Sequence, residues 1–129
     1  MCFYIDAKHP DVKIANKDII CVKRLCKNKG VLGESLYVSP YQEYSYISNF
    51  LYSNSVIGWP FIERKSFKFE FKYVINIGYH TYSSFAKAND WCAGDEVLVW
   101  YIIPEGSKYY YNEYNEEYVS NQIILKGEI

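Results

Sequence analysis

The sequence lacks the motifs of the common cofactor-binding and metal-binding proteins. No GxGxxG or GxxxxGK stretch occurs, so the glycine-rich loops that cradle phosphates are missing. The four cysteines show no CxxC spacing and only two histidines accompany them, which disfavours a structural zinc site. We therefore predict no cofactor, no metal ligand and no catalytic residue.

Long apolar runs are missing too. No stretch reaches the length that spans a bilayer, and the start, MCFYIDAKH, has no charged leader followed by an apolar core. These features predict a cytoplasmic protein without a membrane partner, whose cysteines stay reduced and fill its core.

Positive and negative charges nearly balance over the whole chain, but the two signs gather in different parts of the sequence. The net charge is −1, whereas residues 8–29 hold seven Lys or Arg against two Asp, and residues 94–129 hold seven acids against two Lys. Such a dipole can orient a partner at long range, although a mixed solvated surface is the simpler explanation. Direct nucleic-acid binding is not indicated, because the chain is not basic enough.

Tyrosine is what the sequence has in quantity. The 129 residues suit one domain, spanning 1–129, and 15 of them are Tyr, whose flat rings carry a polar tip. DIICVKRL (18–25), FKFEFKY (67–73) and EVLVWYIIP (96–104) predict strands. The second places four aromatic rings on one face, which predicts one buried face, and the third is apolar on both faces, which predicts a central strand. The fold expected from these patterns is α+β, strand-rich and mostly antiparallel, with one or two short helices.

Other segments are harder to assign. Residues 41–53 fit either a short helix or an irregular aromatic segment, and GWP at 58–60 predicts a turn. YYYNEYNEE, residues 109–117, is interpreted as a polar aromatic excursion in which solvation accounts for the clustered acids. EYVSNQIILKG, residues 117–127, predicts one final strand.

The stretch GYHTYSSFAKANDW, residues 78–91, predicts a strand that runs into a helix. Ser83 or Ser84 can cap the first helical turn, and a neutral His80 imidazole can hydrogen-bond a ligand or its neighbours. The joint therefore either lines a ligand site or only turns a corner. Its candidate ligand contacts are His80, Thr81, Tyr82 and Ser83.

A second candidate site is an aromatic set in the first half of the chain. Rigid rings presented together can anchor a protein interface or stack a base or nicotinamide, because they cost few rotatable bonds to order. The alternative is that they cover a small β core. The candidate partner contacts are Tyr37, Tyr41, Tyr44, Tyr46, Tyr52 and Trp59.

Four further motifs are MCFYI at the start, SPYQ (39–42), GYHTY (78–82) and IPEGSKYY (103–110). Together they resemble a group of small, uncharacterised proteins of bacteriophages and gut bacteria. The resemblance implies a phage-derived protein that works in the cytosol of the bacterial host, and a role against a host factor follows from it.

The segments CVKRL, GYHTYSS and VSNQIIL are similar, more distantly, to motifs of the ADP-ribosyltransferase fold. In that family an early strand carries Arg or His, a later strand ends in Ser-Thr-Ser, and the last strands carry Glu-x-Glu. The resemblance assigns Arg24 to the first motif, Thr81, Tyr82 and Ser83 to the second, and Ser120 and Gln122 to the third. Gln122 cannot supply the negative charge of the family's catalytic glutamate.

These observations favour a non-enzymatic binding protein. Its partner would be a host protein, such as a factor of anti-phage defence that it inhibits, or a nucleotide-like small molecule that it sequesters. The alternative is an NAD-dependent ADP-ribosyltransferase or a degenerate relative of one. The predicted ligand-binding residues are His80, Thr81, Tyr82, Ser83, Arg24 and Gln122.

Overall fold

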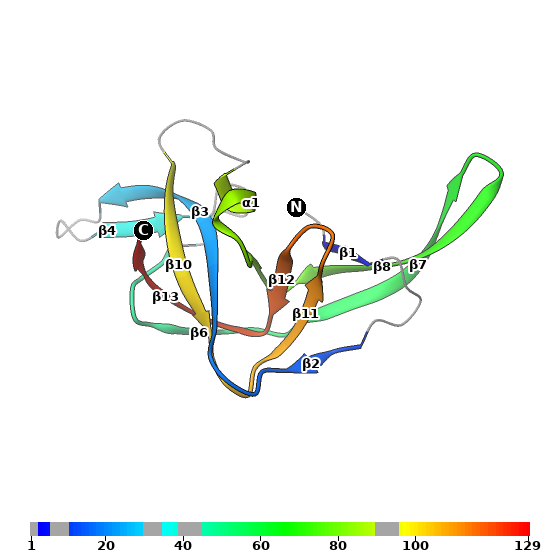
Figure 1. The fold of residues 1–129 in the computed structure, drawn as a ribbon. Helices are drawn as coiled ribbons and strands as arrows, with labels where there is room; N and C mark the ends of the chain where they lie inside the picture. The colour runs from blue at the N-terminus through cyan, green and yellow to red at the C-terminus, as the bar shows by residue number, and fades with distance from the viewer. Residues whose placement is uncertain (1–2, 6–10, 30–34, 39–44, 90–95) are drawn as a thin grey trace.

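Strands dominate the computed structural model, which describes residues 3–5, 11–29, 35–38, 45–89 and 96–129 (Figure 1). Within these ranges there are thirteen strands and one helix of five residues, α1 (Phe85–Asn89). The strands are β1 (Phe3–Ile5), β2 (Lys13–Ile14), β3 (Ile19–Lys29), β4 (Ser35–Val38), β5 (Ser45–Tyr46), β6 (Leu51–Ser53), β7 (Ile57–Lys65), β8 (Lys68–Ile77), β9 (Tyr79–Tyr82), β10 (Glu96–Ile103), β11 (Lys108–Asn112), β12 (Glu117–Ser120) and β13 (Gln122–Glu128).

The strands form two antiparallel sheets. The larger sheet has the order β2-β11-β12-β9-β3-β10-β13-β6, with β4 paired to β3 and β5 paired to β4. The smaller sheet has the order β1-β8-β7. This confirms the strand-rich, antiparallel prediction. Because α1 has only five residues, the described fold is close to all-β, and its topology lends no support to an ADP-ribosyltransferase fold.

The core lies on one face of the larger sheet. The strand β10, between β3 and β13, contributes Val99, Tyr101 and Ile103, which are all fully buried. The ring of Tyr46 meets the rings of Tyr79 and Tyr101 edge to face, at centroid distances of 6.4 and 5.4 Å. The prediction of a central strand is therefore confirmed, and tyrosine rings supply much of its packing.

Residues 109–127 fold differently from their prediction. YYYNEYNEE forms the hairpin of β11 and β12 with a turn at residues 113–116, so it is not an excursion. The predicted final strand is two strands, because the chain bends at Asn121, where the Ser120 hydroxyl donates to the carbonyl oxygen of Gln122 at 3.0 Å. After this bend β13 pairs with β10, whereas β12 pairs with β9. The pattern of alternating side chains does not reveal this bend, because it involves a single residue.

Residues 45–60 also correct the sequence interpretation. The described part of the ambiguous aromatic segment contains β5 and β6, so it is extended and not helical. The predicted turn at 58–60 is wrong, since these residues lie inside β7. Pro60 is tolerated there because β7 is the edge strand of the described sheet. A Cβ at Gly58 would lie 2.7 Å from Cε1 of Tyr73, so glycine lets this ring lie close to the strand.

The smaller sheet extends into a hairpin that stands away from the rest of the molecule (Figure 1). At its base, β1 pairs with β8 at residues 73–75, and Tyr73 and Ile75 pack with Val119 and Tyr110 of the larger sheet. Farther out, residues 61–65 of β7 pair with residues 68–72 of β8, and no third described strand joins them. We refer to residues 61–72 as the hairpin arm.

Candidate functional site

The joint between β9 and α1 is held by hydrogen bonds within the protein. The Ser84 hydroxyl accepts from the amide of Lys87 at 3.2 Å, so Ser84 caps the helix, as predicted. The Ser83 amide donates to the carbonyl oxygen of Glu116 at 2.8 Å, and the Ser83 hydroxyl lies 3.1 Å from the hydroxyl of Tyr111. The Ser84 hydroxyl also donates to Oε2 of Glu116 at 3.2 Å. These contacts tie the joint to the turn between β11 and β12, so the joint does turn a corner.

His80 pairs with a carboxylate that the sequence interpretation missed. Its Nδ1 lies 3.3 Å from Oε1 of Glu117, and the two side chains are only 12% and 4% exposed. Nε2 of the same ring is buried and has no hydrogen-bond partner in the described part of the chain. In the tautomer with hydrogen on Nδ1, Nε2 keeps its lone pair and can accept a hydrogen bond.

The sequence interpretation places Glu117 among the clustered acids of YYYNEYNEE, for which it predicts solvation. The alternation of side chains in EYVS, residues 117–120, is the sequence signal that could have indicated the burial of Glu117. Val119 lies opposite His80 in the pairing of β12 with β9, and Glu117, two residues earlier, shares its face. Because Val119 is buried, Glu117 on the same face is buried too, and it lies beside His80.

Thr81 points to the opposite face from His80 and is fully buried in the core. Its hydroxyl lies against the thiol of Cys21, and burial raises the pKa of Cys21 to about 12. Cys21 is 1% exposed and belongs to the core, which confirms the prediction of core filling for this cysteine, and a thiol with a raised pKa stays protonated. Because Thr81 and His80 face opposite ways, they do not line one side of a common site. Tyr82 is half-buried and shares the face of His80.

A half-buried lysine, Lys23, lies near the same strands. The Nζ of Lys23 lies 5.9 Å from the centroid of the Tyr46 ring. Burial lowers the pKa of Lys23 to about 8, and the negative charge of Glu117 partly offsets this effect. The face of the Tyr46 ring attracts the ammonium, which partly replaces the hydration that Lys23 loses on folding.

Arg24 and Gln122 lie in separate places. Arg24 is buried opposite Leu98 near one end of β10, whereas Gln122 lies beside the other end of that strand, at the start of β13. At about 3.3 Å per residue, roughly 15–20 Å of β10 separates them. Gln122 accepts a hydrogen bond from Ser107 at 3.1 Å and donates one to Ser53 at 3.4 Å. The six predicted ligand contacts therefore do not form one cluster.

The tyrosines predicted to contact a partner are mostly core residues. Tyr37 and Tyr46 are buried, so they cannot contact a partner at the surface, which corrects that prediction. Tyr52 is half-buried, with its ring 5.2 Å from that of Tyr46. These tyrosine rings therefore pack in and over the core, which agrees with the alternative that they cover a small β core. Among the candidate partner contacts that the structure describes, only Trp59 is exposed. Two members of the set lie outside the described residues: Tyr41 and Tyr44.

The hairpin arm presents an apolar face to solvent. The register places Ile62 opposite Phe71, and Phe69 shares their face. The exposed fractions are 59% for Ile62, 51% for Phe71 and 68% for Phe69, and Phe67 in the turn is 95% exposed. The prediction that this face is buried is therefore wrong for the three Phe rings. At the inner end of the face, Tyr73 packs against the larger sheet.

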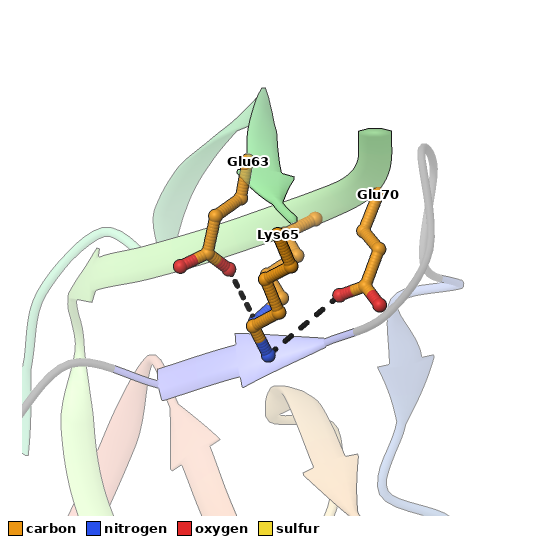
Figure 2. Close-up of polar contacts among 4 residues, drawn as sticks. Glu63, Lys65 and Glu70 are labelled. Atoms are coloured by element: carbon orange, nitrogen blue, oxygen red, sulfur yellow. Dashed lines mark ion pairs between the residues drawn. The ribbon is translucent and has the colours of Figure 1, made fainter. Parts of the chain in front are cut away.

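The opposite face of the arm is polar and internally paired. Glu63 and Glu70 lie opposite each other across the two strands. The Glu63 carboxylate is 2.6 Å from Nζ of Lys72, and the Glu70 carboxylate is 3.7 Å from Nζ of Lys65, which reaches toward it in Figure 2. Hydrogen bonding to Lys72 lowers the pKa of Glu63. Both acids of the arm are therefore engaged by its own lysines.

The arm also keeps a surplus of positive charge. Residues 61–72 hold four basic and two acidic side chains, a net charge of +2. Arg64 and Lys68 have no ion-pair partner in the part of the chain that the structure describes. Arg64 lies on the apolar face, opposite Phe69, and Lys68 lies beside the turn.

The chain matches no known family model, and no curated protein or solved structure is significantly similar to it. Within the described ranges, no three His, Cys, Asp or Glu side chains lie close enough together to hold a metal ion. No helix there is both long and apolar enough to cross a membrane. The two candidate sites are therefore defined by geometry: the hairpin arm and the His80–Glu117 pair.

Proposed function

We propose that this protein is a non-enzymatic binding protein that attaches to a partner protein through the hairpin arm. The observation that supports this best is the exposure of four large apolar side chains on one projecting element. Contiguous apolar surface is unfavourable in water, and soluble proteins expose it mainly where another surface covers it.

The exposed area is large enough to drive binding. A Phe side chain buries about 150–250 Å² when it is covered, so the three exposed rings of the arm offer about 400 Å². At about 25 cal/mol per Å², covering this area contributes about 10 kcal/mol before the cost of association is subtracted. Aromatic anchors of this kind dominate the free energy of many interfaces.

The arm is also organised before it meets a partner. Its strands pair in continuous register from Gly58–Ile75 to Lys65–Lys68, and two ion pairs brace one face. An element that is already ordered loses less conformational entropy on binding. The resemblance to phage proteins suggests that the partner is a host protein and that occupying its groove inhibits a factor of host defence.

Two other functions have less support. A nucleotide-like ligand bound at the joint would have to displace hydrogen bonds that Ser83 and Ser84 already make. Transfer of ADP-ribose from NAD would draw on Arg24 and Gln122, which lie at opposite ends of β10. Incubation with labelled NAD and host extract tests this alternative, and transfer or cleavage that depends on Gln122 would contradict a purely binding role.

The proposed function is tested by capture from a host bacterial lysate on immobilised protein, with mass spectrometry of what is retained. The wild type is compared with a Phe69→Ala/Phe71→Ala variant and with Tyr114→Ala, which removes an exposed ring from the turn between β11 and β12. We expect at least one protein to be lost about 30-fold or more with the arm variant and kept with Tyr114→Ala. Equal capture by all three proteins would contradict the proposal.

A further inference from the structure

We propose that the partner surface that receives the arm is an apolar groove edged by carboxylates, and that the arm enters it with Phe69 and Phe71 facing inward. This inference deepens the proposed function and rests on it. It assigns to each face of the arm a different role and to the partner a definite chemistry.

The apolar face of the arm continues a face that is already packed at its base. Tyr73 and Ile75 lie on the same side of β8 as Phe69 and Phe71, and they pack with Val119 and Tyr110. Toward the tip the larger sheet no longer reaches this face, and the rings become exposed. A partner would extend outward the packing that the protein provides for itself at the base.

Arg64 indicates which chemical groups the partner has at the edge of its groove. It is the one charged residue on the apolar face of the arm, and its described hydrogen bond runs from Nε to the carbonyl oxygen of Ser66 at 3.3 Å. The terminal nitrogens of the guanidinium therefore remain for a partner. When the rings beside Arg64 are covered, these donors lose water and need an acceptor, and a carboxylate matches their planar fork. Lys68 also has no ion-pair partner among the described residues, but it lies opposite Lys65 on the polar face and therefore does not line the groove.

The polar face is unsuited to the interior of an interface. Its two ion pairs are satisfied within the arm, so covering them would remove water from four charges with little new attraction. This face is therefore expected to stay in solvent, and the arm has one direction of entry.

A second copy of the chain and a nucleic acid fit this surface less well. Two arms packed face to face about a two-fold axis would bring two Arg64 side chains into one apolar interface that has no carboxylate on that face. A nucleic acid would need free cations, yet Lys65 and Lys72 are paired with the acids of the arm. An acidic protein groove satisfies both the rings and Arg64.

The test measures binding kinetics with the purified host protein that the wild-type arm captures. Arg64→Glu is compared with Lys17→Glu, which makes the same change of charge at an exposed place outside the arm. We expect Arg64→Glu to slow association about tenfold or more at low salt, and Phe69→Ala mainly to raise the dissociation rate. A Glu→Lys or Asp→Lys change in the partner should restore association of Arg64→Glu. Melting temperatures confirm that each variant is folded.

The outcomes separate the two proposals. If Phe69→Ala weakens binding but Arg64→Glu associates like Lys17→Glu, the arm binds a protein and the acidic edge is wrong. If nuclease abolishes capture, if a 30-nucleotide poly-dT strand competes for the arm, or if sedimentation shows that the captured species is a second copy, the acidic-groove inference is overturned. If Phe69→Ala has no effect, or if the wild type captures no protein, both proposals fail.

Discussion

The hairpin arm and the central strand β10 use similar side chains and reach opposite states. In β10, Val99, Tyr101 and Ile103 are fully buried, whereas in the arm every Phe side chain between residues 67 and 71 is more than half exposed. β10 lies between β3 and β13 and contributes to the larger core, while the arm is a two-stranded ribbon beyond the edge of that core. The difference teaches that alternation assigns side chains to faces, and that neighbouring elements decide which face is covered.

The largest expected effect tests the buried half of this comparison. Tyr101→Ala should lower the free energy of unfolding by about 3–5 kcal/mol, because it leaves a cavity beneath the rings of the core. Urea denaturation measures this loss. Tyr101→Phe is the matched control: the hydroxyl is buried without a partner among the described residues, so its removal should leave stability nearly unchanged. A small loss for Tyr101→Ala would mean that the core is not built around this ring.

The next effect concerns Lys23, the half-buried lysine near Tyr46. Its pKa is about 8 in the folded protein, below the ordinary value of 10.5, so folding at pH 7 removes water from a charged ammonium at a cost. This destabilisation is full below pH 8 and shrinks as the pH rises toward 10.5. Lys23→Met should therefore raise the free energy of unfolding by about 2 kcal/mol at pH 7, and by less at pH 10.

Denaturation of the wild type and Lys23→Met at both pH values checks this difference. Both proteins keep Cys21, so the titration of its thiol largely cancels between them. A gain that stays constant from pH 7 to pH 10 would show that the ammonium is hydrated. The arm supplies a control for Lys23→Met. Lys72 is paired with Glu63, so Lys72→Met is expected to give no gain in the free energy of unfolding.

A smaller effect tests the joint between β9 and α1. Its Ser84 side chain is half-buried, so its exposure lies between that of the core of β10 and that of the arm. Ser84→Ala removes the helix cap and the hydrogen bond to Glu116, and it should lower stability by about 1 kcal/mol. Thermal unfolding followed by circular dichroism measures the shift. Ser84→Asn keeps a capping oxygen and should recover part of the loss. Equal stability of Ser84→Ala and the wild type would show that the joint tolerates loss of the cap.

The smallest expected effect belongs to the arm. Phe69→Ala should change the free energy of unfolding by less than about 0.5 kcal/mol, because the ring is mostly exposed and leaves no cavity. The same variant should weaken partner binding strongly, which separates a binding role from a packing role. A loss of stability close to that of Tyr101→Ala would break the comparison and place the arm in the core.

The sequence interpretation succeeded where a local rule suffices. The Ser84 cap follows from the hydroxyl preceding a helical segment, and the strand at residues 67–73 follows from strict alternation. It failed where distant segments decide. Glu117 comes to lie beside His80 only because β12 pairs with β9, and Tyr37 and Tyr46 are buried because β4 and β5 join the larger sheet.

The sequence by itself determined that this chain is strand-rich and antiparallel, which side chains of the FKFEFKY segment share a face, and where α1 begins. Those properties depend on backbone preferences and on neighbours a few residues away. Only the tertiary structure decided that the Phe face is left exposed, that His80 meets Glu117 and that Arg24 and Gln122 lie apart. Burial and proximity depend on which strands pair across long stretches of chain, and the alternating pattern of each strand is compatible with more than one such pairing.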